Sequence, residues 1–148
     1  MIHQIYSQKD STIYEGSASI NTGIDQILEI TKTYVSGSPN KNTRILLEFD
    51  VNEVSSSIVA GTIPSNAKYY LMLTAMEAKE IPLKYELQVH PVSGSWDNGI
   101  GKKHHVPLTR EGVSWKNRKD LTQWETGSWN INSTGSYQTS ASAGGGSW

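Results

Sequence analysis

The sequence contains no cysteine, which excludes disulfide bonds and any metal site built on thiolates. Its formal net charge is only −1 at pH 7, without the basic excess that is typical of nucleic-acid-binding proteins. No apolar run reaches the length of a membrane-spanning helix, and the first residues lack the apolar stretch of a signal peptide. We therefore expect neither nucleic acid nor a membrane as a partner, and synthesis in a cytoplasm.

Ser, Thr, Asn and Gly supply much of what the sequence does contain. Hydrophobic residues make up 36% of the 148 positions and charged residues 18%, and both shares are below those of an average globular protein. The length suits one domain with a core, followed by a tail. This mixture favours a β-rich domain with polar loops over a helical bundle.

Residues 44–51, with the sequence RILLEFDV, show the clearest alternation in the chain. Successive side chains of a strand point to opposite faces, so this stretch predicts a strand with one face in the core. The face expected in the core comprises Ile45, Leu47, Phe49 and Val51. The face expected in solvent comprises Arg44, Leu46, Glu48 and Asp50. Its charges could bind a ligand, but pairing across strands explains them more simply.

Five further stretches have strand character and one has helix character. Alternation or β-branched content predicts strands at residues 11–16, 25–35, 67–76, 82–92 and 112–115. In the fourth of these, Tyr85, Leu87 and Val89 are expected to point inward. Residues 52–64 break the two-residue period and predict one or two helical turns, with Asn52 as the N-cap and Gly61 at the end.

The apolar spacing disappears after residue 121, where the chain becomes rich in Ser, Thr, Gly and Trp. Such a composition is typical of segments that have no regular structure in isolation. We therefore divide the chain into a β-sandwich domain, residues 1–121, and an irregular C-terminal arm, residues 122–148.

All five tryptophans lie in the second half of the chain, outside the clearest strands. Aromatic side chains in irregular segments can anchor those segments to a core or to a neighbouring subunit. They can also stack on sugar rings when their faces are exposed. The residues expected to contact another subunit are Trp124, Trp129, Tyr137 and Trp148. The residues that could form a glycan platform are Trp96 and Trp115.

The sequence offers no complete metal or catalytic site. His104 and His105 are adjacent, so their side chains diverge on an extended chain, although His3 or His90 could join them as a third ligand. We expect these histidines to face solvent. The run from Asp97 to Gly99 predicts a tight turn with too few oxygen ligands for a calcium loop. We expect no cofactor, leave a structural calcium ion open without naming ligands, and nominate no catalytic residue.

The order of several stretches resembles the DNRLRE-like β-sandwich domains of phages and bacteria, which are related in shape to carbohydrate-binding modules. The matching stretches are DSTIYEG, RILLEFDV, NEVSSSI, KYYLMLTAM, LKYELQVHPVSGSW and EGVSW, within residues 10–115. The version carried on tailed-phage virions, in fibres and collars, is the most similar. The sandwich type usually continues with further strands after the last of these stretches. Here the last strands are irregular, a neighbouring subunit completes the sheet, or the chain is a fragment.

The sequence thus predicts an all-β, antiparallel β-sandwich of jelly-roll type with one short helical crossover and an irregular C-terminal arm. The resemblance implies a non-enzymatic structural component of a tailed-phage virion, in a fibre, collar, capsid-decorating or tail position, assembled in the host cytoplasm. Its expected partners are other virion proteins and further copies of itself. The alternatives are a module that binds host or environmental polysaccharide and a secreted adhesin fragment.

Overall fold

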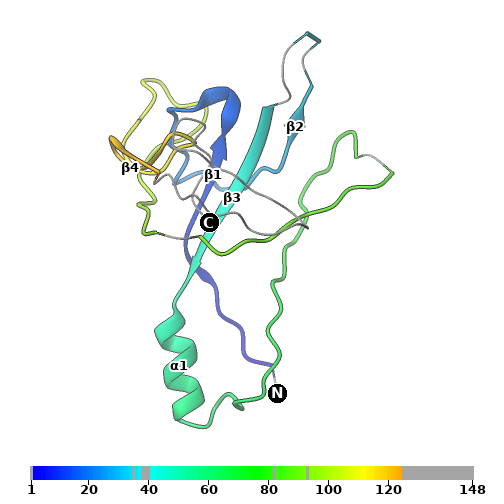
Figure 1. Cartoon of the computed structure of the whole chain (residues 1–148), viewed down its shortest axis with the longest axis vertical. Helices are drawn as coiled ribbons and strands as arrows, with labels where there is room; N and C mark the ends of the chain where they lie inside the picture. The colour runs from blue at the N-terminus through cyan, green and yellow to red at the C-terminus, as the bar shows by residue number, and fades with distance from the viewer. Residues whose placement is uncertain (1, 35, 38–40, 82, 93, 125–148) are drawn as a thin grey trace. The chain divides into compact units, whose positions relative to one another are not determined.

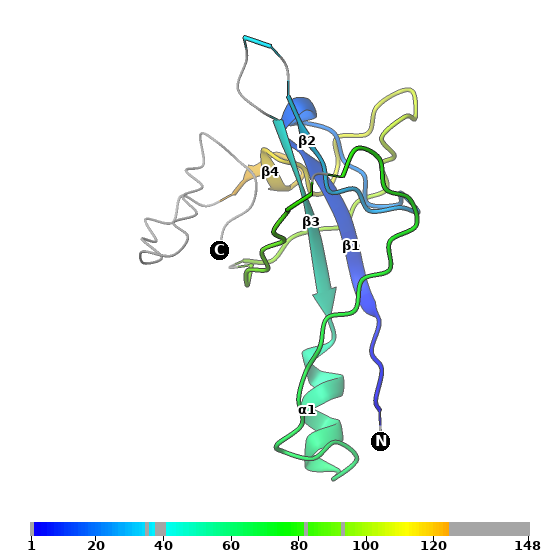
Figure 2. The ribbon, with the colours of Figure 1, turned by 90° about the vertical axis from the view of Figure 1, so that its right-hand side faces the viewer.

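Strand β1 (Ser7–Tyr14) pairs along its length with strand β3 (Lys41–Phe49), and β3 pairs on its other side with β2 (Lys32–Thr33). Both pairings are antiparallel, and the register places Ser11 opposite Leu46. The two long strands run side by side in both ribbon views (Figures 1 and 2). A second antiparallel sheet is the hairpin of β4 (Asn117–Lys119) and β5 (Thr122–Gln123). The β-rich, antiparallel character predicted from the sequence is confirmed.

The structure is a computed structural model that describes residues 2–34, 36–37, 41–81, 83–92 and 94–124. The chain forms two compact units. The sheet unit comprises Tyr6–Phe49 and Pro91–Trp148, of which residues up to Trp124 are described. The helix unit comprises Met1–Ile5 and Asp50–His90. The predicted boundary after residue 121 falls inside the β4–β5 hairpin, so the described residues 122–124 belong to the sheet unit.

Helix α1 (Val51–Val59) confirms the short helix predicted after the central strand, but its cap differs from the prediction. The carboxylate of Asp50 accepts hydrogen bonds from the backbone N–H groups of Asn52, at 2.9 Å, and Glu53, at 3.3 Å. This is the geometry of an N-cap, so Asp50 takes the role predicted for Asn52. Consequently β3 ends at Phe49, and the prediction that Asp50 and Val51 extend the strand is wrong.

The predicted inward face of β3 is also wrong. Leu46, expected in solvent, is only 3% exposed, whereas Ile45, Leu47 and Phe49 are half-buried. Arg44 and Glu48 share the face of Leu46, but their charged groups contact other side chains of the protein, so this face can still be buried. The Arg44 guanidinium lies 4.7 Å from the centre of the Trp115 ring, and long charged side chains can cover apolar surface with their aliphatic stems.

Several predicted strands are absent from the described residues. Of residues 25–35 only β2 is a strand, because side chains replace the ladder: Glu29 N–H donates to the Thr12 hydroxyl, and Thr31 N–H donates to the Thr43 hydroxyl at 2.6 Å. The structure has no strand at 112–115, where the backbone N–H of Val113 instead donates to the carbonyl of Asp97. Nor do the described residues of 67–76 and 82–92 form strands; Figure 2 shows this part of the chain, in green, without arrows.

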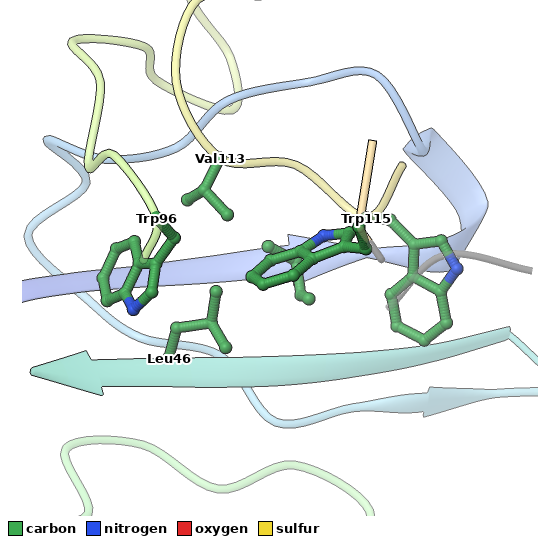
Figure 3. Packing of buried hydrophobic residues seen from close by; sticks show 6 residues of the cluster. Leu46, Trp96, Val113 and Trp115 are labelled. Atoms are coloured by element: carbon green, nitrogen blue, oxygen red, sulfur yellow. The ribbon is translucent and has the colours of Figure 1, made fainter. Parts of the chain in front are cut away.

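The hydrophobic core lies in the sheet unit, on the Leu46 side of β3 (Figure 3). Three tryptophans dominate it, and its members are Ile13, Leu46, Trp96, Val113, Trp115 and Trp124. Among the described residues of the helix unit, Ile63 is the buried apolar side chain. The two units therefore differ in kind: one is built around an aromatic core, and the other leaves most of its apolar residues in solvent.

Candidate functional site

One buried amide, that of Asn21, connects three loops of the sheet unit. Its Nδ2 donates to the carbonyl of Asn98 at 2.7 Å and to that of Val113 at 2.8 Å. Its Oδ1 accepts from the backbone N–H of Gly101 at 2.7 Å and of Gly23 at 3.3 Å. Asn21 is fully buried, so these bonds satisfy every hydrogen-bonding group of its amide away from water. The amide acts as a structural clamp.

Glycines make the close approach around this clamp possible. A Cβ at Gly99 would overlap Asn21 Oδ1 and lie 2.5 Å from the carbonyl oxygen of Glu111, and Gly99 has a positive φ of 77°. A Cβ at Gly23 would overlap the carbonyl of Asn98. This cluster was not identified in the sequence analysis. The only local signal was a polar residue beside a glycine, which many turns share.

In the described part of the sheet unit, three cations lie over aromatic rings. Lys9 Nζ is 5.6 Å from the centre of the Trp96 ring, and Arg44 covers the Trp115 ring as described above. Lys103 Nζ is 4.4 Å from the centre of the Tyr14 ring. Two of these cations are also paired with carboxylates: Lys9 with Glu48 at 2.8 Å, and Lys103 with Glu29 at 2.6 Å. The rings therefore contact charged side chains of the same chain.

Three tryptophans of the irregular segments are buried in the core of the sheet unit. Trp96 is 3% exposed and Trp115 is 6% exposed, so neither presents the open face that the alternative of a glycan platform needs. Trp124 is 1% exposed, and its indole N–H donates to the Ser114 carbonyl at 3.0 Å. It stabilises its own core instead of standing free for a subunit contact. The other predicted contact residues, Trp129, Tyr137 and Trp148, lie outside the described residues.

The predicted metal candidates do not converge. Among the described residues, no group of three or more His, Asp or Glu side chains could hold a metal ion. His104 and His105 are exposed, and His3 lies 3.6 Å from Glu53 in the helix unit. The carboxylate of Asp97 is 3.1 Å from Lys119 Nζ, and the Asn98 amide donates to the carbonyl of Gly23. The turn at these two residues thus pairs with protein groups.

A pocket of about 130 Å³ lies beside the sheet, lined by Tyr14, Lys41, Asn42, Lys103 and neighbouring Gly, Ser and Thr residues. The Tyr14 hydroxyl is buried and has no hydrogen-bond partner among the described residues. Burial, and secondly the negative charge of Glu29, raise the pKa of this phenol above its ordinary value. The phenol therefore stays protonated near neutral pH, and it lies beside a lysine that is paired with Glu29.

The most unusual feature of the described surface is the apolar segment, which we define as residues 68–89 of the helix unit. Its large apolar side chains are between 45% and 106% exposed. They are Tyr69, Tyr70, Leu71, Met72, Leu73, Met76, Ile81, Leu83, Tyr85, Leu87 and Val89. In the part of the chain that the structure describes, this segment belongs to no strand and makes no backbone–backbone hydrogen bond. The prediction that Tyr85, Leu87 and Val89 point into a core is therefore wrong for this structure.

Comparison of the chain with protein-family models, curated proteins and solved structures found no match. Within the described ranges, no helix has the length and apolar character needed to cross a membrane. The functional argument therefore starts from the residues themselves, and above all from the apolar segment.

Proposed function

We propose that this chain is a non-enzymatic structural subunit that acts through contacts with other protein chains. From the resemblance to DNRLRE-like domains, we propose that this assembly is a tailed-phage virion, with the chain in a fibre, collar, capsid-decorating or tail position. The observation that carries the proposal is the exposure of the apolar segment. Single exposed apolar residues are ordinary, but a contiguous exposed run marks an interaction surface.

The segment has two properties that suit contact with protein. Its apolar side chains gain roughly 25 cal/mol for each Å² that a partner removes from water. Its backbone N–H and C=O groups, unpaired with other backbone groups among the described residues, can add a strand to another sheet. Because residues 68–76 and 83–89 are rich in aromatic and aliphatic residues, we propose that they become the missing strands of a sandwich on assembly.

The alternative of glycan binding depended on exposed faces of Trp96 and Trp115. Stacking on a sugar needs an open aromatic face, whereas Trp96 and Trp115 are buried and lie beneath Lys9 and Arg44. The assembly role therefore has the stronger support.

The proposal is tested with the full-length chain and a variant of the first half of the segment. Tyr70→Ser combined with Met72→Ser removes two side chains that are 83% and 77% exposed. Light scattering is expected to give the wild type a mass above the 16.3 kDa of one chain, rising with concentration, and to give the variant a lower mass. The urea midpoint of the dilute monomer is expected to stay unchanged, since these side chains lie in solvent.

Leu46→Ser is the matched control, because it makes a similar change at a buried position and is expected to lower the urea midpoint. A wild-type chain that remains at 16.3 kDa at every concentration and is retained on a polysaccharide column would contradict the proposal and favour glycan binding.

A further inference from the structure

The second half of the apolar segment, residues 81–89, has one fully apolar face when its backbone is extended. Its odd-numbered residues are Ile81, Leu83, Tyr85, Leu87 and Val89, and each is more than half exposed. The even-numbered residues of the described stretch 83–89 are polar or charged. Alternate residues of an extended chain share a face, so an apolar row lies opposite a polar row.

This stretch is self-complementary about Tyr85. When a second copy runs antiparallel with Tyr85 opposite Tyr85, Lys84 lies opposite Glu86 of the second copy, and Glu86 lies opposite Lys84. Leu83 then lies opposite Leu87. At the ends, Ile81 lies opposite Val89. The remaining pair sets Pro82 opposite Gln88, and every other pair joins either two apolar residues or two opposite charges.

We propose that two copies of this chain associate by antiparallel pairing of residues 81–89, with a two-fold axis at Tyr85. The inference rests on the proposed function and names its partner, a second copy of the chain. Such a contact is isologous, because the same surface is used by both copies, and it closes as a dimer. It supplies backbone partners for a stretch that has none among the described residues.

Other registers are less favourable. If one copy slides along the other by one residue, the apolar residues of one copy lie opposite the polar residues of the other. Centring the pair on Lys84 would place two lysines opposite each other, and like charges in that position are destabilising. Centring it on Glu86 would place Lys84 opposite Gln88, so both Lys–Glu pairs would be lost. Only the register at Tyr85 keeps the apolar row together and pairs the charges.

An engineered disulfide tests the geometry, because the chain has no cysteine of its own. Residues directly opposite in an antiparallel pair have Cα atoms about 4.5–5.5 Å apart, within the range that a disulfide spans. Tyr85→Cys is therefore expected to give a covalent dimer under mild oxidation. In the matched control, Gln88→Cys, the two cysteines are six residues apart along the pair, about 20 Å, and should remain unlinked.

Charge variants test the register. Lys84→Glu creates two Glu–Glu contacts across the axis and Glu86→Lys creates two Lys–Lys contacts, so each is expected to weaken dimerisation about tenfold. The double variant Lys84→Glu with Glu86→Lys restores opposite charges and should dimerise like the wild type. An equimolar mixture of the two single variants should form mixed dimers, seen by native mass spectrometry when one variant is labelled with ¹⁵N so that the two chains differ clearly in mass.

The outcomes separate this inference from the proposed function. Disulfide formation at position 85 but not 88, with recovery in the double variant and the mixture, supports the inference. Oligomers that form normally in both single variants, without a disulfide at position 85, overturn it and leave the structural role standing with another contact. A monomeric chain in which residues 81–89 pair with residues 68–76 of the same molecule overturns it as well, since Tyr85→Cys would then remain monomeric.

Discussion

Replacing Asn21 by alanine should destabilise the sheet unit more than any single exposed polar substitution. The change removes a buried amide with three short hydrogen bonds of 2.7–2.8 Å and one longer bond of 3.3 Å. Each lost bond leaves a backbone carbonyl or N–H group buried without its partner, at about 1–1.5 kcal/mol per short bond. The expected loss is therefore about 3–5 kcal/mol, out of a total of about 5–15 kcal/mol for a typical domain.

Tryptophan fluorescence during urea unfolding measures this loss, because Trp96, Trp115 and Trp124 all lie in the core of the sheet unit. Asn117→Ala is the control in the same unit. The Asn117 side chain donates one exposed hydrogen bond, to the Asp120 carbonyl, so its removal should cost about 1 kcal/mol or less. A loss below about 1 kcal/mol for Asn21→Ala would refute the clamp, since water would then be replacing the amide without cost.

Asn21→Asp extends the same test to pH. A carboxylate at this position would face the carbonyl oxygens of Asn98 and Val113, so burial and these oxygens would raise its folded-state pKa. A raised folded-state pKa means that the variant is most stable below the unfolded-state value of about 3.9 and loses stability as the pH rises through the folded-state pKa. A variant whose stability, relative to wild type, does not fall between acidic and neutral pH would contradict this argument.

Three other predictions follow from the sheet unit. Gly99→Ala should lower the free energy of unfolding by more than about 3 kcal/mol, because the new Cβ overlaps Asn21 Oδ1. Gly37→Ala should lower it by only about 1–2 kcal/mol, since Gly37 has the same φ of 77° but open space around it. Urea unfolding midpoints of the two variants measure the difference. Trp124→Ala should destabilise the monomer by about 3–5 kcal/mol, measured by circular dichroism; an unchanged monomer would favour the subunit-contact prediction. Tyr14→Phe should leave stability at pH 7 unchanged or higher, because the buried hydroxyl lacks a partner, and should lessen the loss of stability above about pH 10. The sign follows from the raised pKa of this phenol: its stabilisation is present below the unfolded-state pKa and is lost as the pH rises, so equal alkaline profiles for variant and wild type would contradict it.

The local sequence pattern was sufficient to predict two elements of the structure. The alternation around residues 44–49 predicted β3, and the switch to a helical period after it predicted α1. The pattern could not tell which face of β3 is buried. Leu46 stands between Arg44 and Glu48, so its face looks polar in sequence, yet Arg44 covers the Trp115 ring and Glu48 pairs with Lys9. The presence of charged residues on one face of a strand therefore does not show that this face is exposed to solvent.

The clamp at Asn21 could not be predicted because its partners are distant in sequence. Its side chain bonds to backbone groups that are 77, 80 and 92 residues away, in loops without any periodic pattern. A single sequence contains no local signal for such contacts. The buried tryptophans follow the same rule: they lie in irregular segments, and their burial depends on the sheet face opposite them rather than on their neighbours in the chain.

The apolar segment presents the opposite relation between sequence and structure. Its local pattern favours strands strongly, yet the described chain offers these residues neither a backbone partner nor a core. In proteins that fold well, the local propensity of a segment agrees with its structure and its burial in the fold. Segments in which the two disagree are concentrated at functional sites. A solvent-exposed segment with strand propensity forms a strand only when another strand provides its backbone hydrogen-bond partners. The symmetric order of charges and apolar residues around Tyr85 is the reason for proposing a second copy of the chain as that strand.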